Sequence, residues 1–181
     1  MSTITLKSGP EKCRLMRTGT PARAALPGGQ SDFFSEAGSA PGRRIQSEDE
    51  LVALCLALLD GRGELSAAEE QLAAPASAPS FEAHEVDAVR SAILRGGDPL
   101  GDAFSSIRSV QARRATGAVY TPNVIVGSMM NWLAGQGAPA RIVDPGAGSG
   151  RFLLAAGKAF PDAQLVAVEM DPLAALMLRA N

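Results

Sequence analysis

The sequence predicts an α/β fold, in which two parallel strands with helices follow a small helical region and a disordered N-terminal tail. Two apolar runs, 141–144 and 165–169, each end in an acidic residue and are each followed by a helical pattern. Between the first run and its helix lie Gly146, Gly148 and Gly150, a turn with almost no side-chain bulk. Strands that alternate with helices in this way are typical of a parallel sheet.

Composition and charge exclude several classes of protein. The 181 residues carry a formal net charge of −2, so the strongly basic field of a nucleic-acid-binding domain is missing from this chain. The longest apolar run, 51–59, is too short to span a bilayer, and the N-terminus has no apolar signal core. Two distant cysteines and a single histidine indicate neither a disulfide nor a zinc site. We therefore predict a cytoplasmic protein without a metal or a membrane contact.

Residues 1–46 are predicted to form the disordered tail. They contain four prolines and many glycines and serines, and they show no sustained period of 2 or 3.6 residues. Such a segment cannot bury enough apolar surface to offset the entropy that ordering costs.

Residues 47–114 are predicted to be a helical region. Ser47 and the three acids after it are a typical N-terminal cap, and leucines then recur at helical spacing as far as residue 59. Further helices are predicted over 66–74, over 81–95 and from the Asp98-Pro99 pair onward.

Residues 115–181 are predicted to contain the two strands. Thr121 is expected to cap a helix with Pro122 at its first position. The apolar face of that helix is expected to lie in the core, with Trp132 against the sheet; its residues are Ile125, Val126, Met129, Met130 and Leu133. Phe152 continues the glycine turn as a helix, and Pro172 begins another after the second strand.

The two strand-end acids indicate the kind of ligand that the turn could bind. A carboxylate at Asp144 would repel the pyrophosphate of a dinucleotide, but it would attract the cationic tail of S-adenosylmethionine. Glu169 follows the glycine turn by about 20 residues, which is the spacing at which open α/β sheets place the acid that binds a ribose. We therefore expect a nucleoside cofactor with a positive tail.

At this point the chain resembles a known family. The run DPGAGSG at 144–150, with EMDP at 169–172, resembles the first two cofactor motifs of class I S-adenosylmethionine-dependent methyltransferases, which have a Rossmann-like sheet. Upstream, TGAVYTP at 116–122 resembles the segment that precedes these motifs in the N6-adenine DNA methyltransferases of restriction–modification systems. The resemblance implies S-adenosylmethionine as cofactor and DNA as partner.

The resemblance also implies a role for individual residues. It assigns Tyr120 and Thr121 to the methionine tail of the cofactor. It assigns Asp144, Gly146 and Gly148 to the glycine loop, Glu169 to the ribose and Met170 to the adenine face.

The resemblance covers residues 97–181 and implies the N-terminal fragment of a longer enzyme. The family's catalytic motif, Asn or Asp followed by Pro-Pro and an aromatic residue, does not occur in this sequence. We therefore assign no catalytic residue, expect the chain alone to be inactive, and expect DNA to be bound by parts outside it. Two alternatives stay open: a class I methyltransferase that acts on RNA or protein, and a non-catalytic remnant or binding module.

Overall fold

The structure is a computed structural model that describes residues 2–6, 43–61, 63–74, 80–115 and 117–181. Strands β2 (Arg141–Asp144) and β3 (Gln164–Glu169) pair in parallel, with Ile142 opposite Leu165 and Asp144 opposite Ala167. This confirms the predicted pair of parallel strands and an α/β arrangement. Both strands end at the same edge of the sheet, so Asp144 and Glu169 emerge on the same side.

The prediction of a tail disordered from its first residues was wrong for residues 2–6. Strand β1 (Ser2–Leu6) pairs antiparallel with β3, which gives the sheet order β1-β3-β2. The segment is rich in β-branched residues, and the free edge of β3 supplies partners for its backbone N–H and C=O groups. Residues 1 and 7–42 of the predicted tail lie outside the described residues.

The predicted helical region contains helices at the expected places. Ser47 caps the first of them by accepting a hydrogen bond from the Glu50 amide at 3.2 Å, and Asp98 caps the fourth by accepting one from the Gly101 amide at 2.9 Å. A short fifth helix was not predicted. The five are α1 (Glu48–Leu59), α2 (Ala67–Ala73), α3 (Ala83–Leu94), α4 (Pro99–Ile107) and α5 (Val110–Ala115).

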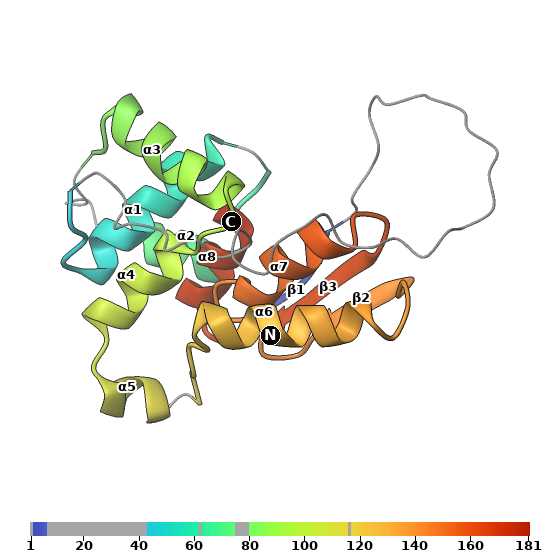
Figure 1. Ribbon diagram of the computed structural model, residues 1–181. Helices are drawn as coiled ribbons and strands as arrows, with labels where there is room; N and C mark the ends of the chain where they lie inside the picture. The colour runs from blue at the N-terminus through green and yellow to red at the C-terminus, as the bar shows by residue number, and fades with distance from the viewer. Residues whose placement is uncertain (1, 7–42, 62, 75–79, 116) are drawn as a thin grey trace, which may run out of the picture.

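Three helices accompany the two parallel strands, and α8 joins them to the N-terminal helices. They are α6 (Asn123–Ala134), α7 (Arg151–Ala159) and α8 (Pro172–Ala180). Helix α6 packs on α7, whereas α8 packs on both α1 and α2. Helices α3 and α4 pack on α1 in turn, so α1 to α4 lie together at one end of the strands, whereas α5 stands apart from α8 (Figure 1).

Two predictions about α6 were wrong. Pro122 occupies its N-cap position and makes no side-chain cap bond, so Thr121 is not the cap. Trp132 is 68% exposed, and Ile125 and Met129 are about half exposed. The rest of the predicted face is confirmed, because Val126 is buried and Met130 and Leu133 pack against the core cluster of α7 and β3. Periodicity thus identified the apolar helix and part of its buried face.

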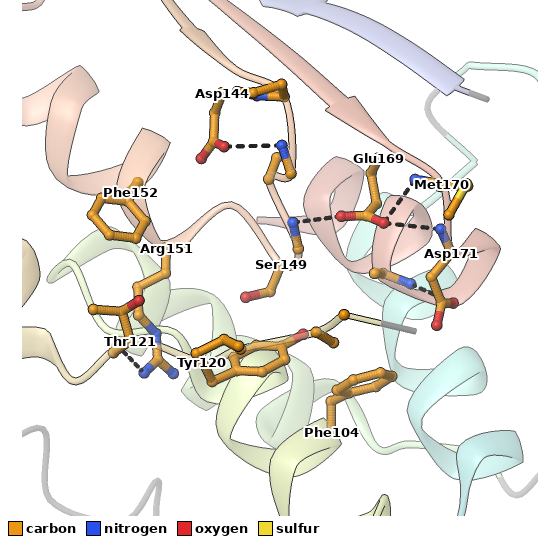
Figure 2. A pocket seen from close by; sticks show the side chains of 18 of the residues that line it. Phe104, Tyr120, Thr121, Asp144, Ser149, Arg151, Phe152, Glu169, Met170 and Asp171 are labelled. Atoms are coloured by element: carbon orange, nitrogen blue, oxygen red, sulfur yellow. Dashed lines mark hydrogen bonds between the residues drawn. The ribbon is translucent and has the colours of Figure 1, made fainter. Parts of the chain in front are cut away.

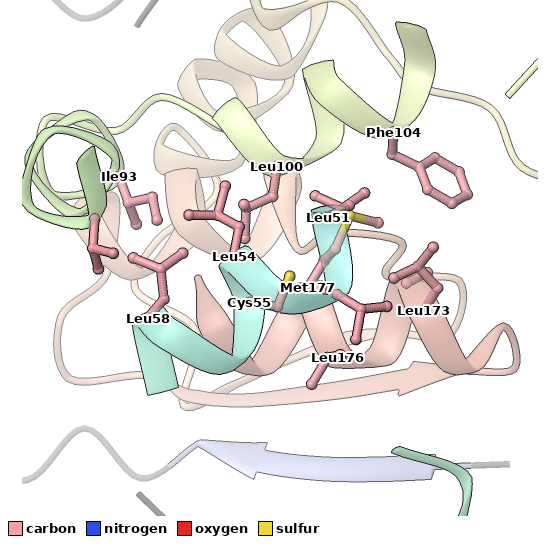
Figure 3. Packing of buried hydrophobic residues seen from close by; sticks show 13 residues of the cluster. Leu51, Leu54, Cys55, Leu58, Ile93, Leu100, Phe104, Leu173, Leu176 and Met177 are labelled. Carbon is pink, nitrogen blue, oxygen red and sulfur yellow. The ribbon is translucent and has the colours of Figure 1, made fainter. Parts of the chain in front are cut away.

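The main core is shared between α1 and α8. Leu51, Leu54 and Cys55 of α1 are almost completely buried against Leu176 and Met177 of α8 (Figure 3). A second cluster joins α7 to β3 through Leu153, Ala156, Leu165 and Ala167, among others. Burial of apolar surface at both clusters holds the carboxyl end of the sheet in place relative to α1 and α4. Among the described residues, no helix has the length and apolar character needed to cross a membrane.

Candidate cofactor site

A pocket of about 1030 Å³ lies at the carboxyl ends of β2 and β3. Its walls come from three chain segments, 117–121, 144–149 and 169–172, together with Phe104 and Arg108 of the helical region (Figure 2). All seven residues for which the sequence predicts a cofactor role line this pocket: Tyr120, Thr121, Asp144, Gly146, Gly148, Glu169 and Met170. The structure thus brings them together, while their individual roles remain predictions.

The glycine turn needs its glycines for two different reasons. Gly148 and Gly150 have φ angles of +55° and +91°, a region that side-chain-bearing residues rarely adopt. A Cβ atom at Gly150 would also lie 2.6 Å from Cδ1 of Leu178, so the missing side chain lets α8 approach. At Gly146 no atom lies within 4 Å of a Cβ position, which leaves that face of the turn open to the pocket.

Glu169 joins the end of β3 to the glycine turn. Its Oε2 accepts a hydrogen bond from the Gly148 amide at 2.7 Å, and its Oε1 accepts from the amides of Met170 and Asp171 at 2.7 and 2.9 Å. Each carboxylate oxygen can accept more than one hydrogen bond, so Oε2 retains capacity for a hydroxyl donor. Met170 is 77% exposed at the pocket mouth, where its side chain is accessible to a ligand.

Asp144 is a half-buried carboxyl that shares the pocket with Glu169. Burial raises its pKa above the ordinary value, the hydrogen bond from the Gly146 amide at 3.2 Å lowers it, and the negative charge of Glu169 raises it further. Removal from water and a like charge nearby both disfavour the ionised form. A cation bound between the two carboxylates would offset both effects.

Tyr120 carries a buried hydroxyl in the pocket wall. Burial raises the pKa of its phenol, so the group is neutral at physiological pH, and its oxygen has no hydrogen-bond partner among the described residues. Its ring lies 5.5 Å from the ring of Phe104, centroid to centroid. A buried polar atom without a partner is unfavourable, so this oxygen is a ready contact for a polar ligand atom.

Three charged residues at the site were missed by sequence reasoning. Arg108 donates hydrogen bonds to the carboxylates of Glu48, at 2.7 Å, and of Asp171. Its guanidinium carbon lies 4.5 Å from the ring centroid of Phe104. These ion pairs raise its pKa, so it keeps its charge. Its partners are 60 and 63 residues away, so no local pattern indicates them.

The other two missed residues are Asp98 and Arg151, which form a salt bridge of 2.9 Å; Arg151 lines the pocket, whereas Asp98 is buried and does not. The only feature of the sequence that could have indicated a role for Arg151 is its position directly after Gly150 of the glycine turn.

No group of three or more His, Cys, Asp or Glu side chains in the described part of the chain is arranged to hold a metal ion.

Comparison with known proteins shows a similarity to part of a methyltransferase. No protein-family model matches the chain, and no solved structure matches it. Over 137 residues, or 76% of its length, the chain is 59% identical to the type II methyltransferase M.XamI of Xanthomonas campestris pv. amaranthicola. The matched part is 26% of that protein, so the chain spans about a quarter of the length of this curated relative. Over most of its length, the chain is therefore similar to one part of a type II methyltransferase.

Proposed function

We propose that the pocket binds S-adenosylmethionine and that the whole protein methylates the N6 amino group of adenine in DNA, in the cytoplasm, as part of a restriction–modification system. On this proposal the chain contributes the cofactor-binding part of a Rossmann-like sheet. The observation that carries it is that Asp144 and Glu169 share one pocket with an open glycine turn and with Tyr120. Two carboxylates and a bare turn suit a nucleoside with a cationic tail better than a pyrophosphate.

The residues present fit this cofactor. Glu169 would bind the ribose hydroxyls, and Met170 would lie against the adenine. Asp144, with Tyr120 and Thr121, would face the methionine end, where the unpartnered hydroxyl of Tyr120 would gain a polar contact. When bound, S-adenosylmethionine supplies a methyl group on a cationic sulfur. The protein's part is to hold that group in line with its acceptor.

The transfer step itself is expected to depend on residues outside this chain. The Asn or Asp-Pro-Pro-aromatic motif of the family does not occur in the sequence, so no catalytic residue is proposed here. Contacts with DNA are likewise proposed for other parts of the protein, since this chain has a net charge of −2.

Calorimetric titration of the 181-residue chain tests the cofactor proposal. We expect binding of S-adenosylmethionine and none of NAD. A preference for NAD would overturn the charge argument, and binding of neither would favour a non-catalytic module. For the substrate, the full-length protein is incubated with labelled S-adenosylmethionine and with DNA, RNA or protein. Label recovered as N6-methyladenine in DNA supports the proposal, and label in RNA or protein contradicts it.

A further inference from the structure

We propose that Arg151, held by Asp98, is a positioning residue that fixes the Tyr120–Thr121 segment at the pocket and thereby determines how tightly the methionine tail is bound. This inference rests on the proposed function, because it concerns the affinity of the same pocket for S-adenosylmethionine. It adds two residues that no motif of the sequence indicates.

All three guanidinium nitrogens of Arg151 are engaged, and its side chain is only 12% exposed. Nε and Nη2 donate to Asp98 at 2.9 Å and to Asp102 at 2.5 Å, both on the α4 side. Nη1 donates to the backbone carbonyl of Thr121 at 3.1 Å, and the guanidinium carbon lies 5.6 Å from the ring centroid of Tyr120. Arg151 therefore connects helix α4 to the segment that forms one wall of the pocket (Figure 2).

Asp98 fixes the other end of this connection. It is 2% exposed and accepts hydrogen bonds from Ser149 Oγ at 2.5 Å and from Asn181 Nδ2 at 3.1 Å, besides those from Arg151 and the Gly101 amide. These donors belong to α4, the glycine turn, α7 and the residue after α8. A buried carboxylate with so many hydrogen-bond partners has little freedom to move. Asp98 therefore holds the guanidinium of Arg151 in a fixed orientation.

Helix α4 packs closely against the glycine turn around Asp98. A Cβ atom at Gly101 would lie 2.1 Å from Asp98 Oδ2 and 2.6 Å from Ser149 Oγ, so only glycine allows this approach of α4 to the glycine turn. Lysine cannot replace Arg151 here, because one ammonium group cannot reproduce the fork that reaches two carboxylates and a carbonyl.

Two ligands separate a positioning role from a merely structural one. S-adenosylmethionine has the tail that Tyr120 and Thr121 are proposed to face, whereas 5′-methylthioadenosine has the same nucleoside without it. Loss of positioning should weaken binding of the first ligand more than the second. General loosening of the fold should weaken both alike.

The experiment compares the full 181-residue chain with its R151K variant by calorimetry, with circular dichroism to verify folding. Because Arg151 makes a charge-assisted hydrogen bond to the segment, we expect R151K to bind S-adenosylmethionine about tenfold more weakly. Binding of 5′-methylthioadenosine should change by less than about twofold, as for a surface substitution. R90K is the matched control: Arg90 also pairs with a carboxylate, Asp87, and a backbone carbonyl, that of Leu58, but it does not line the pocket.

Equal losses for the two ligands, or no loss in a folded R151K chain, would overturn the inference. If R151K fails to fold, D102N replaces it, because Asp102 is 64% exposed and its loss leaves the Asp98 contact in place. D102N should weaken S-adenosylmethionine selectively, by about threefold, as expected for a more exposed ion pair, and unchanged binding would overturn the inference. If the unsubstituted chain binds no S-adenosylmethionine, the proposed function itself fails. This outcome differs from a failure of the inference, because it is seen in the unsubstituted chain and not in a variant.

Discussion

The carboxylate of Glu169 accepts a hydrogen bond of 2.7 Å from the backbone amide of Gly148. This bond joins the end of β3 to the turn after β2, two segments that lie 21 residues apart in the chain. Since the same carboxylate also accepts from the amides of Met170 and Asp171, it organises both loops at the carboxyl edge of the sheet. The shape of the pocket is therefore set before any ligand binds.

Replacing Glu169 with glutamine tests this organising role. In E169Q one oxygen becomes an NH₂ group, which cannot accept a hydrogen bond, so a backbone amide loses its partner whichever way the side chain turns. We expect the free energy of unfolding to fall by about 1 kcal/mol. Affinity for S-adenosylmethionine should fall at least about tenfold, because both the loop geometry and a charged acceptor are lost. Urea denaturation and calorimetry measure the two effects.

The matched control for E169Q is E70Q, which changes the same kind of side chain at an exposed position on α2. E70Q should alter neither stability nor binding by a measurable amount. Full affinity in E169Q would show that the Glu169 carboxylate is not used for the cofactor.

Asp144 is predicted to favour binding at the expense of stability. Its pKa is raised by burial, so the ionised carboxylate is less favourable in the folded chain than in the unfolded one. D144N removes that charge and should raise the Tm at pH 7. The same variant should bind S-adenosylmethionine about tenfold more weakly, because it lacks the charge proposed to attract the cationic tail.

The size of this Tm difference depends on pH. A raised pKa means that Asp144 contributes most favourably when protonated, and that this contribution is lost as the pH rises through the raised value. The difference in Tm between D144N and the unsubstituted chain should therefore be present at neutral pH and vanish by about pH 3. D162N, at an exposed turn position, is the control that should show no Tm gain. A lower Tm for D144N at pH 7 would contradict the assignment.

The pocket could be predicted from the sequence because the residues at its centre lie close together along the chain. The strand, the glycine turn and the acids Asp144 and Glu169 occupy one stretch of about 30 residues, and the parallel register brings the two acids to one edge. The Tyr120–Thr121 segment was identified only through its resemblance to a family. Its place in the same pocket depends on tertiary contacts with Phe104 and Arg151.

The remaining features could not be predicted, because they depend on pairs distant in the chain. Arg108 meets Asp171 over 63 residues, and Asp98 meets Ser149 over 51. No periodicity or short motif encodes such pairs. Strand β1 was missed for a similar reason: five residues of β character become a strand only when an edge such as that of β3 is available.

The shared core of α1 and α8 predicts how the chain unfolds. Leu176 of α8 is fully buried against α1, so the predicted regions 47–114 and 115–181 meet in one apolar cluster. L176A should lower the free energy of unfolding by about 2–5 kcal/mol. Signals from both regions should still change in one cooperative transition. Hydrogen exchange of α1 and α7 amides measures this, and loss of protection in α1 alone would indicate two independent units.

Trp132 gives a direct test of the face that α6 exposes. It is the single tryptophan of the chain and is 68% exposed, so its fluorescence should be that of an indole in water and should be quenched readily by acrylamide. W132Q should change the free energy of unfolding by less than about 0.5 kcal/mol. F104A is the contrasting aromatic variant, because Phe104 is 1% exposed and its truncation should cost about 3–5 kcal/mol. A large loss of stability in W132Q, with emission typical of a buried indole, would instead place Trp132 against the sheet, as its position in an apolar helix first indicated.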